Sequence, residues 1–104
     1  MTYIEELREV IRNLHGVESS HVDSQLIKDT FQGKTIWEGI VEVFDLHGHP
    51  EATKVYAWAC EADNQRKPRH VTMLNLGSVT CPLLAVRAVT VEEFRKLMPT
   101  KEVL

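Results

Sequence analysis

Two histidines at alternate positions are the strongest candidates for metal chemistry in this sequence. They lie in the stretch Asp45-Leu46-His47-Gly48-His49-Pro50-Glu51. Side chains two positions apart in an extended chain point to the same side, about 6.6 Å apart, so His47 and His49 can share a metal ion. Asp45 or Glu51 can add an oxygen ligand, as in iron sites built from two histidines and one carboxylate. The glycine and proline in this stretch favour a bent turn instead, so we predict a solvated turn without metal or cofactor.

Two glutamates form the next candidate, because paired carboxylates carry out general acid and base catalysis in glycosidases. Glu38 and Glu42 are four residues apart in a strand-like segment, which separates them by about 13 Å. Glycosidase pairs lie within about 9.5 Å, so this pair does not fit that chemistry. We expect both to be partly solvated acids, or partners for an arginine or lysine on a neighbouring strand or subunit.

The two cysteines are candidate nucleophiles. Cys60 ends the apolar stretch Tyr56-Ala57-Trp58-Ala59-Cys60, where a buried and inert thiol is the usual outcome. Cys81 precedes Pro82 at the start of a predicted helix, a position that lowers the pKa of a thiol. The sequence contains no motif that ties either thiol to a histidine. We therefore assign no catalytic residue and lean towards a protein that is not an enzyme.

One short basic cluster bears on nucleic-acid binding. It is the stretch Gln65-Arg66-Lys67-Pro68-Arg69-His70. Tyr56 and Trp58 can offer stacking surfaces, as in proteins that bind single strands. The whole chain, however, has 12 Lys and Arg against 15 Asp and Glu, a formal net charge of −3, whereas domains that grip nucleic acid are usually basic. We therefore predict a solvated hairpin end and no nucleic-acid partner.

Length and composition are those of one globular domain. The chain has 104 residues, of which 43% are hydrophobic and 26% charged. We expect a single domain over residues 1–104, with an ordered core at about 2–98 and a loose tail at 99–104. The longest mainly apolar run, Pro82–Val91, is too short to cross a bilayer, so no membrane contact is expected. Two cysteines and an acidic N-terminal segment favour the cytoplasm over secretion.

Hydrophobic periodicity divides the chain into a helix, four strands and a second helix. Apolar residues recur at three- and four-residue steps over Thr2–His15, and Thr2 with Glu5 matches a capping box. Gly16 can take the left-handed conformation that closes this helix. Strand patterns follow, with a Gln32-Gly33 hairpin turn between the first two, at His21–Phe31, Thr35–Leu46, Lys54–Ala62 and Arg69–Leu76. A helix over Pro82–Met98 completes the chain. Short connections favour antiparallel pairing, so we predict an α+β fold, αββββα, with both helices packed on one face of a mostly antiparallel sheet.

The predicted sheet carries more apolar surface than two helices on one face can cover. Alternate positions of both central strands are apolar on both sides, although one side also holds Glu38 and Glu42. The candidate binding residues are Ile36, Trp37, Ile40, Phe44, Tyr56 and Trp58.

Three interpretations of this surplus remain open. The long hairpins can curl and cover the second face themselves. The face can pack on another copy of the chain, which makes the protein a homodimeric binding domain without enzymatic activity. The third interpretation is a small enzyme or small-molecule-binding protein whose pocket is lined by Trp37, Tyr56 and Trp58. We favour the homodimer.

Part of the sequence also resembles other proteins, and the resemblance bears on the kind of organism the protein comes from. The stretch Ile36–Phe44, continued by Gly48-His49-Pro50 and Tyr56-Ala57-Trp58, resembles small uncharacterised bacterial α+β proteins of about 100 residues, including integron gene-cassette products. The similarity runs from the first predicted helix to the last. It implies a free-standing bacterial cytoplasmic protein and brings no activity or functional residue with it.

Overall fold

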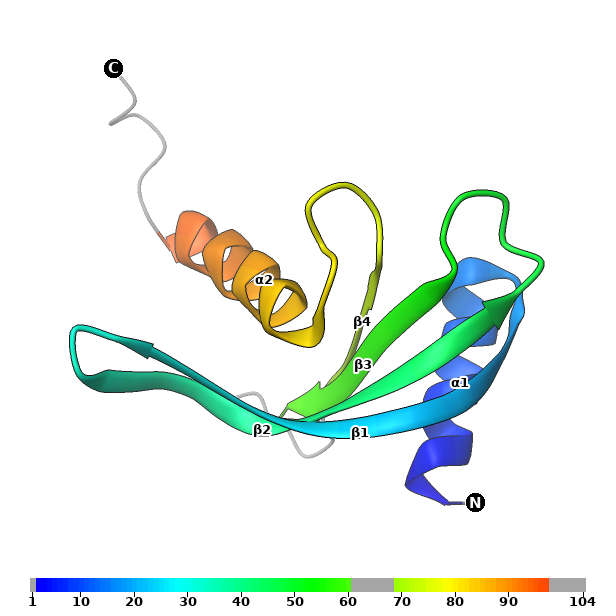
Figure 1. Cartoon of the computed structure of the whole chain (residues 1–104), viewed down its shortest axis with the longest axis horizontal. Helices are drawn as coiled ribbons and strands as arrows, with labels where there is room; N and C mark the ends of the chain where they lie inside the picture. The colour runs from blue at the N-terminus through cyan, green and yellow to red at the C-terminus, as the bar shows by residue number, and fades with distance from the viewer. Residues whose placement is uncertain (1, 61–68, 98–104) are drawn as a thin grey trace.

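The N-terminal helix α1 (Tyr3–His15) is fixed at both ends by local interactions (Figure 1). The computed structural model describes residues 2–60 and 69–97. Thr2 Oγ1 accepts a hydrogen bond from the Glu5 backbone N–H at 3.1 Å, and Glu5 Oε1 accepts one from the Thr2 N–H at 2.9 Å. Gly16 adopts a left-handed φ of 75°, and its N–H donates to the Arg12 carbonyl. The predicted capping box and glycine stop are therefore confirmed.

Four antiparallel strands follow in the order β1-β2-β3-β4, as the sequence predicted. Their bounds are β1 (Glu18–Phe31), β2 (Lys34–His47), β3 (Lys54–Cys60) and β4 (Arg69–Leu74). The two-residue turn at Gln32 and Gly33 has φ angles of 52° and 79°, the positive values that a tight hairpin needs. The α+β class is thus confirmed.

The first two strands are longer than the sequence predicted. Glu18 pairs with His47 at the far end of the hairpin, so β1 begins before His21 and β2 continues beyond Leu46 into the predicted solvated turn. The added residues belong to the strands because their backbones pair across the hairpin. The side chains of Glu18–Ser20 do not alternate between apolar and polar, so the sequence did not indicate this pairing. Residues 65–68 of the predicted hairpin end, the end of the third predicted strand and the tail at 99–104 lie outside the described residues.

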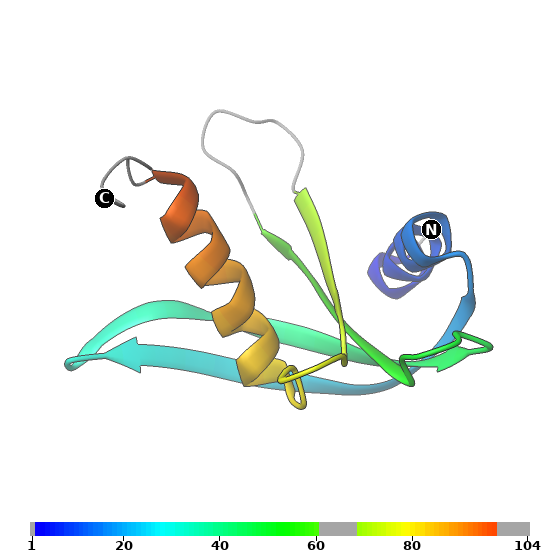
Figure 2. The same ribbon diagram turned by 90° about the horizontal axis from the view of Figure 1, so that it is seen from above.

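The sheet divides where β2 and β3 separate. The two strands pair only from Glu42 opposite Ala57 to Asp45 opposite Lys54. Within the described residues, the earlier part of β2 pairs with β1 alone, so residues 23–31 and 34–41 extend as a two-stranded arm (Figure 1). Strands β3 and β4 run away from β1 and β2 between the two helices (Figure 2).

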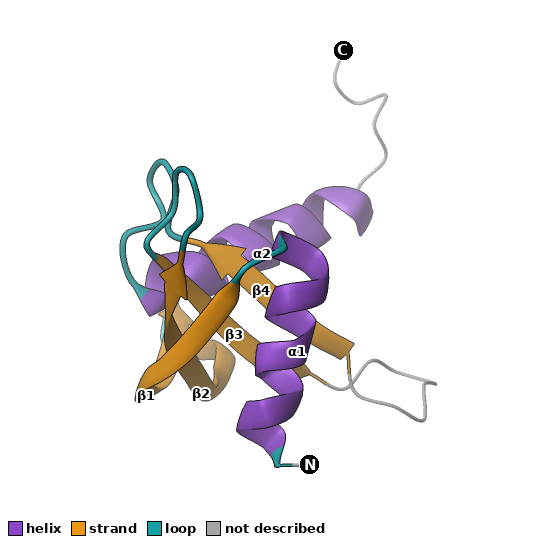
Figure 3. Cartoon of the chain, turned by 90° about the vertical axis from the view of Figure 1, so that its right-hand side faces the viewer, coloured by secondary structure: helices purple, strands orange, loops and turns teal. Residues whose placement is uncertain are grey.

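The helices pack on opposite faces of this sheet, so the predicted placement of both on one face is wrong. The C-terminal helix α2 (Pro82–Leu97) covers one side, and α1 the other (Figure 3). The buried core under α2 consists of Val41, Val43, Tyr56, Trp58, Ala85 and Val86. The core under α1 consists of Leu7, Ile11, Phe44, Val55 and Ala57. Neighbouring positions on β2 and β3 alternate between these cores, which explains why both sides of the strands are apolar.

A buried ion pair holds α2 to the arm. Asp29 on β1 is almost fully buried, and Arg87 Nε donates to its Oδ1 at 3.2 Å. The guanidinium supplies the partner that a buried carboxylate requires. This pair fixes the helix over the face that carries Trp37, which lies directly opposite Asp29 in the register.

Candidate functional site

The face of the arm on the α1 side is left uncovered beyond the end of that helix. Residues directly opposite each other in an antiparallel pair share one face. Three such pairs, Ser24 with Glu42, Leu26 with Ile40 and Lys28 with Glu38, follow one another along this face. We call these six residues the open strip. Leu26 is 66% exposed and Ile40 47%, so two large apolar side chains meet solvent at its centre.

The uncovered end of the sheet on the α2 side differs in character from the open strip. At the corresponding open end of the α2 side, Ser20 lies opposite Asp45, and both are polar. Lys54 Nζ lies 2.5 Å from Asp45 Oδ1, and both side chains are nearly half exposed. One uncovered end of the sheet is therefore polar and the other apolar, which makes the open strip the candidate binding surface.

Three polar side chains form a hydrogen-bonded cluster where the open strip meets α1. His21 Nε2 lies 2.8 Å from Glu42 Oε1, and Ser24 Oγ donates to the same oxygen. Ser24 Oγ also lies 3.2 Å from His21 Nε2. The ring of His21 meets Phe44 edge-on, with centroids 5.2 Å apart. Glu42, only 7% exposed, is thereby supplied with partners in its buried position.

This cluster has the residue types of a catalytic triad without its geometry. A triad places the serine on one ring nitrogen and the carboxylate on the other, so that the imidazole can relay a proton. Here Ser24 and Glu42 both approach His21 Nε2. The arrangement therefore satisfies a buried acid and does not activate a nucleophile. Our expectation of a partly solvated Glu42, or one paired with an arginine or lysine, is wrong, because His21 and Ser24 reach it across the β1–β2 ladder.

Tyr3 on α1 binds β3 just beyond the point at which β2 and β3 separate. Its hydroxyl oxygen accepts a hydrogen bond from the Ala59 N–H at 3.0 Å, in a part of β3 that no longer pairs with β2. Burial raises the pKa of the Tyr3 phenol, against the effect of the Ala59 hydrogen bond, and the charges of Glu42 and Glu6 raise it further. Tyr3 is therefore a neutral phenol at physiological pH, and it marks the α1 end of the open strip.

The structure does not bring the six predicted binding residues together. Ile36 and Ile40 are about half exposed on the arm, Ile36 at a break in the β1–β2 register. Phe44 is fully buried against α1. The three remaining residues, Trp37, Tyr56 and Trp58, pack in or against the α2 core.

The aromatic residues that were candidates to line a pocket fill the protein interior instead. Tyr56 is 3% exposed and Trp58 2%. The rings of Trp37 and Trp58 meet edge-on with centroids 5.8 Å apart. Edge-to-face pairs of this kind add to core stability beyond the area they bury. These side chains therefore belong to the packing of α2 on the sheet.

The two histidines of the candidate metal motif have separate partners. His47 Nε2 lies 2.6 Å from Ser20 Oγ on the neighbouring strand. His49 Nδ1 accepts hydrogen bonds from the backbone N–H groups of Glu51 and Ala52, at 3.0 and 2.9 Å. His49 therefore shapes the loop between β2 and β3 through its ring nitrogen. Among the described residues, no three His, Cys, Asp or Glu side chains form a group that could hold a metal ion.

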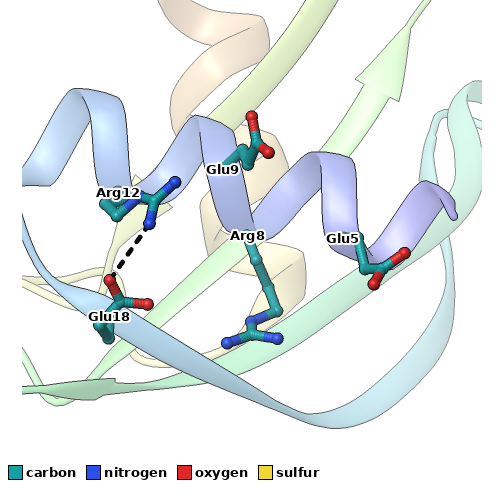
Figure 4. Close-up of a pocket in the computed structure, with 5 residues that line it drawn as sticks. All are labelled: Glu5, Arg8, Glu9, Arg12 and Glu18. Carbon is teal, nitrogen blue, oxygen red and sulfur yellow. Dashed lines mark ion pairs between the residues drawn. The ribbon is translucent and has the colours of Figure 1, made fainter. Parts of the chain in front are cut away.

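A small charged cleft lies between α1 and the beginning of β1 (Figure 4), with a volume of about 210 Å³. Its lining residues are Glu5, Arg8, Glu9, Arg12 and Glu18. Four of them already have structural partners. Glu5 closes the helix cap, Arg8 Nε donates to the Ser19 carbonyl at 3.1 Å, and Arg12 lies 3.6 Å from Glu18. The cleft is therefore the joint between α1 and β1, with charges of both signs.

The basic cluster and the two cysteines lie only partly within the described residues. The basic cluster falls largely at residues 61–68, outside the described part of the chain, although His70 Nε2 lies 3.7 Å from Glu6 Oε1. The side chain of Cys60 is also outside it. Cys81 is a partly buried free thiol whose carbonyl accepts a hydrogen bond from the Ala85 N–H, at the start of α2. That contact gives Cys81 a role in beginning the helix.

Comparison of the chain with protein-family models, with curated proteins and with solved structures finds no match. Among the described residues, no helix has the length and apolar character needed to cross a membrane. Functional inference therefore rests on the surface of the molecule itself.

Proposed function

We propose that this protein is a bacterial cytoplasmic interaction domain that forms a homodimer through the open strip. The observation that carries the proposal is the exposure of Leu26 and Ile40 as a facing pair. They lie on a sheet face whose other end is fully buried under α1, around Phe44. An apolar surface continuous with a core is the kind of surface that a second protein layer covers.

The area of the arm indicates how tightly the two copies should bind each other. Residues 23–31 reach about 30 Å at the rise of an extended strand, and two strands with their side chains are about 10–15 Å wide. The footprint is therefore about 300–450 Å² per copy, below the roughly 800 Å² of a standard interface. We expect a reversible dimer with a dissociation constant in the micromolar range.

A second copy of the chain fits this surface better than an unrelated partner, because its charges match themselves. Lys28 and Glu38, of opposite sign, flank the apolar pair on the same face. A surface with one charge of each sign beside an apolar centre can meet its own copy with opposite charges in contact. The burial of Tyr56 and Trp58 also supports an interaction domain over a protein with an aromatic-lined pocket.

A pair of matched leucine substitutions tests the proposal. Leu26 lies in the open strip, and Leu14 lies on α1; they are 66% and 63% exposed. The Leu26→Lys substitution places a charge in the proposed interface and should abolish association, whereas Leu14→Lys makes the same chemical change elsewhere and should leave it intact.

The measurement is sedimentation equilibrium from low to high micromolar concentration, with circular dichroism to show that both variants are folded. We expect the unmodified chain and Leu14→Lys to approach twice the monomer mass, and folded Leu26→Lys to remain monomeric. A monomeric unmodified chain at high micromolar concentration would refute the proposal, and so would equal association of the two variants.

A further inference from the structure

The charged pair beside the apolar centre defines how two copies can be oriented. Lys28 and Glu38 lie directly opposite each other, two residues beyond Leu26 and Ile40 along the arm. Both side chains are exposed. Although the structure describes both residues, they form no ion pair with each other within the chain. Within the described residues, no ion pair takes up either charge.

We propose that two copies dock face to face around a two-fold axis that runs along the arm between β1 and β2. This inference rests on the homodimer proposed above and specifies its geometry. Such an axis exchanges the two strands, so β1 of one copy lies on β2 of the other. Leu26 then packs on the partner's Ile40, and Lys28 meets the partner's Glu38. Symmetry repeats each contact, which gives two intermolecular ion pairs around one apolar centre.

A second face-to-face two-fold arrangement, with the axis across the strands, brings like charges together. An axis across the strands through the Leu26–Ile40 pair places β2 on the partner's β2, with the strand direction reversed. Glu38 then lies over the partner's Glu42, a buried carboxylate whose hydrogen bonds already come from His21 and Ser24. Two facing carboxylates repel, and the cost rises when one of them is buried. The axis along the arm avoids this contact.

This arrangement also agrees with the way in which sheets pack. Two antiparallel sheets stack about 10 Å apart with their strands within about 30° of each other. An axis along the arm keeps the strands aligned in this range. Alternation along β1 and β2 directs Leu26, Lys28, Glu38 and Ile40 to the interface, while the opposite side of the arm remains covered by α2.

Two charge-reversal variants test the orientation, and neither alters the apolar centre. In K28E, both members of the pair are acidic, and in E38K both are basic. Each variant alone places like charges across the interface, so we expect its self-association to weaken about tenfold, as two exposed ion pairs become two repulsions. An equimolar mixture restores opposite charges between copies, and we expect heterodimers with about the affinity of the unmodified homodimer.

Mixing separates contacts between copies from contacts within one copy. If Lys28 and Glu38 acted only within the hairpin, each variant would keep its like-charged pair in the mixture and nothing would be restored. Attraction between oppositely charged proteins cannot explain heterodimer formation either. The formal net charge of −3 falls by two units in K28E and rises by two units in E38K, so both variants remain negative. Native mass spectrometry, with one variant extended by a short N-terminal tag, counts homodimers and heterodimers directly.

The outcomes distinguish the orientation from the dimer itself. Preferential heterodimer formation supports the axis along the arm. A dimeric unmodified chain whose charge-reversal variants associate alike, alone or mixed, overturns the orientation and leaves the homodimer in place. A monomeric unmodified chain overturns both. The variant E9K makes the same charge change as E38K on α1, at an exposed position outside the open strip, and should associate as the unmodified chain does.

Discussion

Two residues on the same strand and the same face should respond very differently to truncation. Phe44 is fully buried between α1 and β3, among Leu7, Ile11 and Val55. Ile40, four residues earlier on β2, belongs to the open strip and is 47% exposed. Truncation to alanine removes a core side chain in one case and a half-solvated side chain in the other. The difference between the two losses of stability therefore shows where along β2 the packing of α1 on the sheet ends.

The expected costs follow from these environments. Phe44→Ala leaves a cavity under α1 and removes the edge-on contact with His21, so it should lower the free energy of unfolding by about 3–5 kcal/mol. Ile40→Ala leaves no enclosed cavity and loses only the buried half of a side chain worth about 1.5–3 kcal/mol, so it should cost about 1 kcal/mol. Domains of this size are stable by about 5–15 kcal/mol, so both variants should fold.

Urea denaturation at low protein concentration checks these values, because dilution removes the contribution of dimer formation to stability. With a slope near 1.5 kcal/mol per molar urea, the midpoint should fall by about 2 M or more for Phe44→Ala and by roughly 0.7 M for Ile40→Ala. Equal costs would refute the reasoning, because they would mean that the open strip is covered within one chain.

Two further predictions concern α1 and its contacts. Ser19 Oγ is buried without a hydrogen-bond partner in the described part of the chain, so Ser19→Ala should raise the free energy of unfolding by about 1 kcal/mol, measured by urea denaturation. Burial lowers the pKa of His15, which lies 2.9 Å from Thr72 Oγ1, and His49 lowers it further. As the pH falls, His15 is protonated in the unfolded chain before it is protonated in the folded chain. The contribution of neutral His15 to stability is therefore complete above its ordinary pKa of 6.5 and is lost as the pH falls through the lower folded-state pKa. His15→Gln should therefore lose less stability than the unmodified chain between about pH 7.5 and about pH 5.5, and an unchanged loss would contradict the assignment.

Elements governed by local interactions could be predicted from the sequence. The capping box of Thr2 and Glu5, the left-handed Gly16 and the Gln32-Gly33 turn each depend on residues within a few positions of one another. The pattern of apolar residues likewise separated helix from strand, and short connections required antiparallel neighbours. These features therefore determine the α+β class and the strand order.

The candidate site depended on contacts between distant segments. Sequence spacing placed Ile40 and Phe44 on one side of a strand, but it gave no measure of how far along that side α1 would reach. It also gave no sign that Tyr56 and Trp58 would face α2. The partner of Glu42 was missed for the same reason, because His21 and Ser24 are 21 and 18 positions away along the chain. The β1–β2 register alone brings them within reach.

The sequence by itself determined the elements, their order and the presence of apolar residues on both sides of the central strands. Only the tertiary structure decided which of those residues a helix covers. The physical reason is that side-chain alternation follows from backbone geometry within one strand, whereas cover depends on where α1 and α2 come to lie after the chain has turned. Each helix shields one end of an opposite face, and this placement leaves Leu26 and Ile40 exposed while Phe44 is buried.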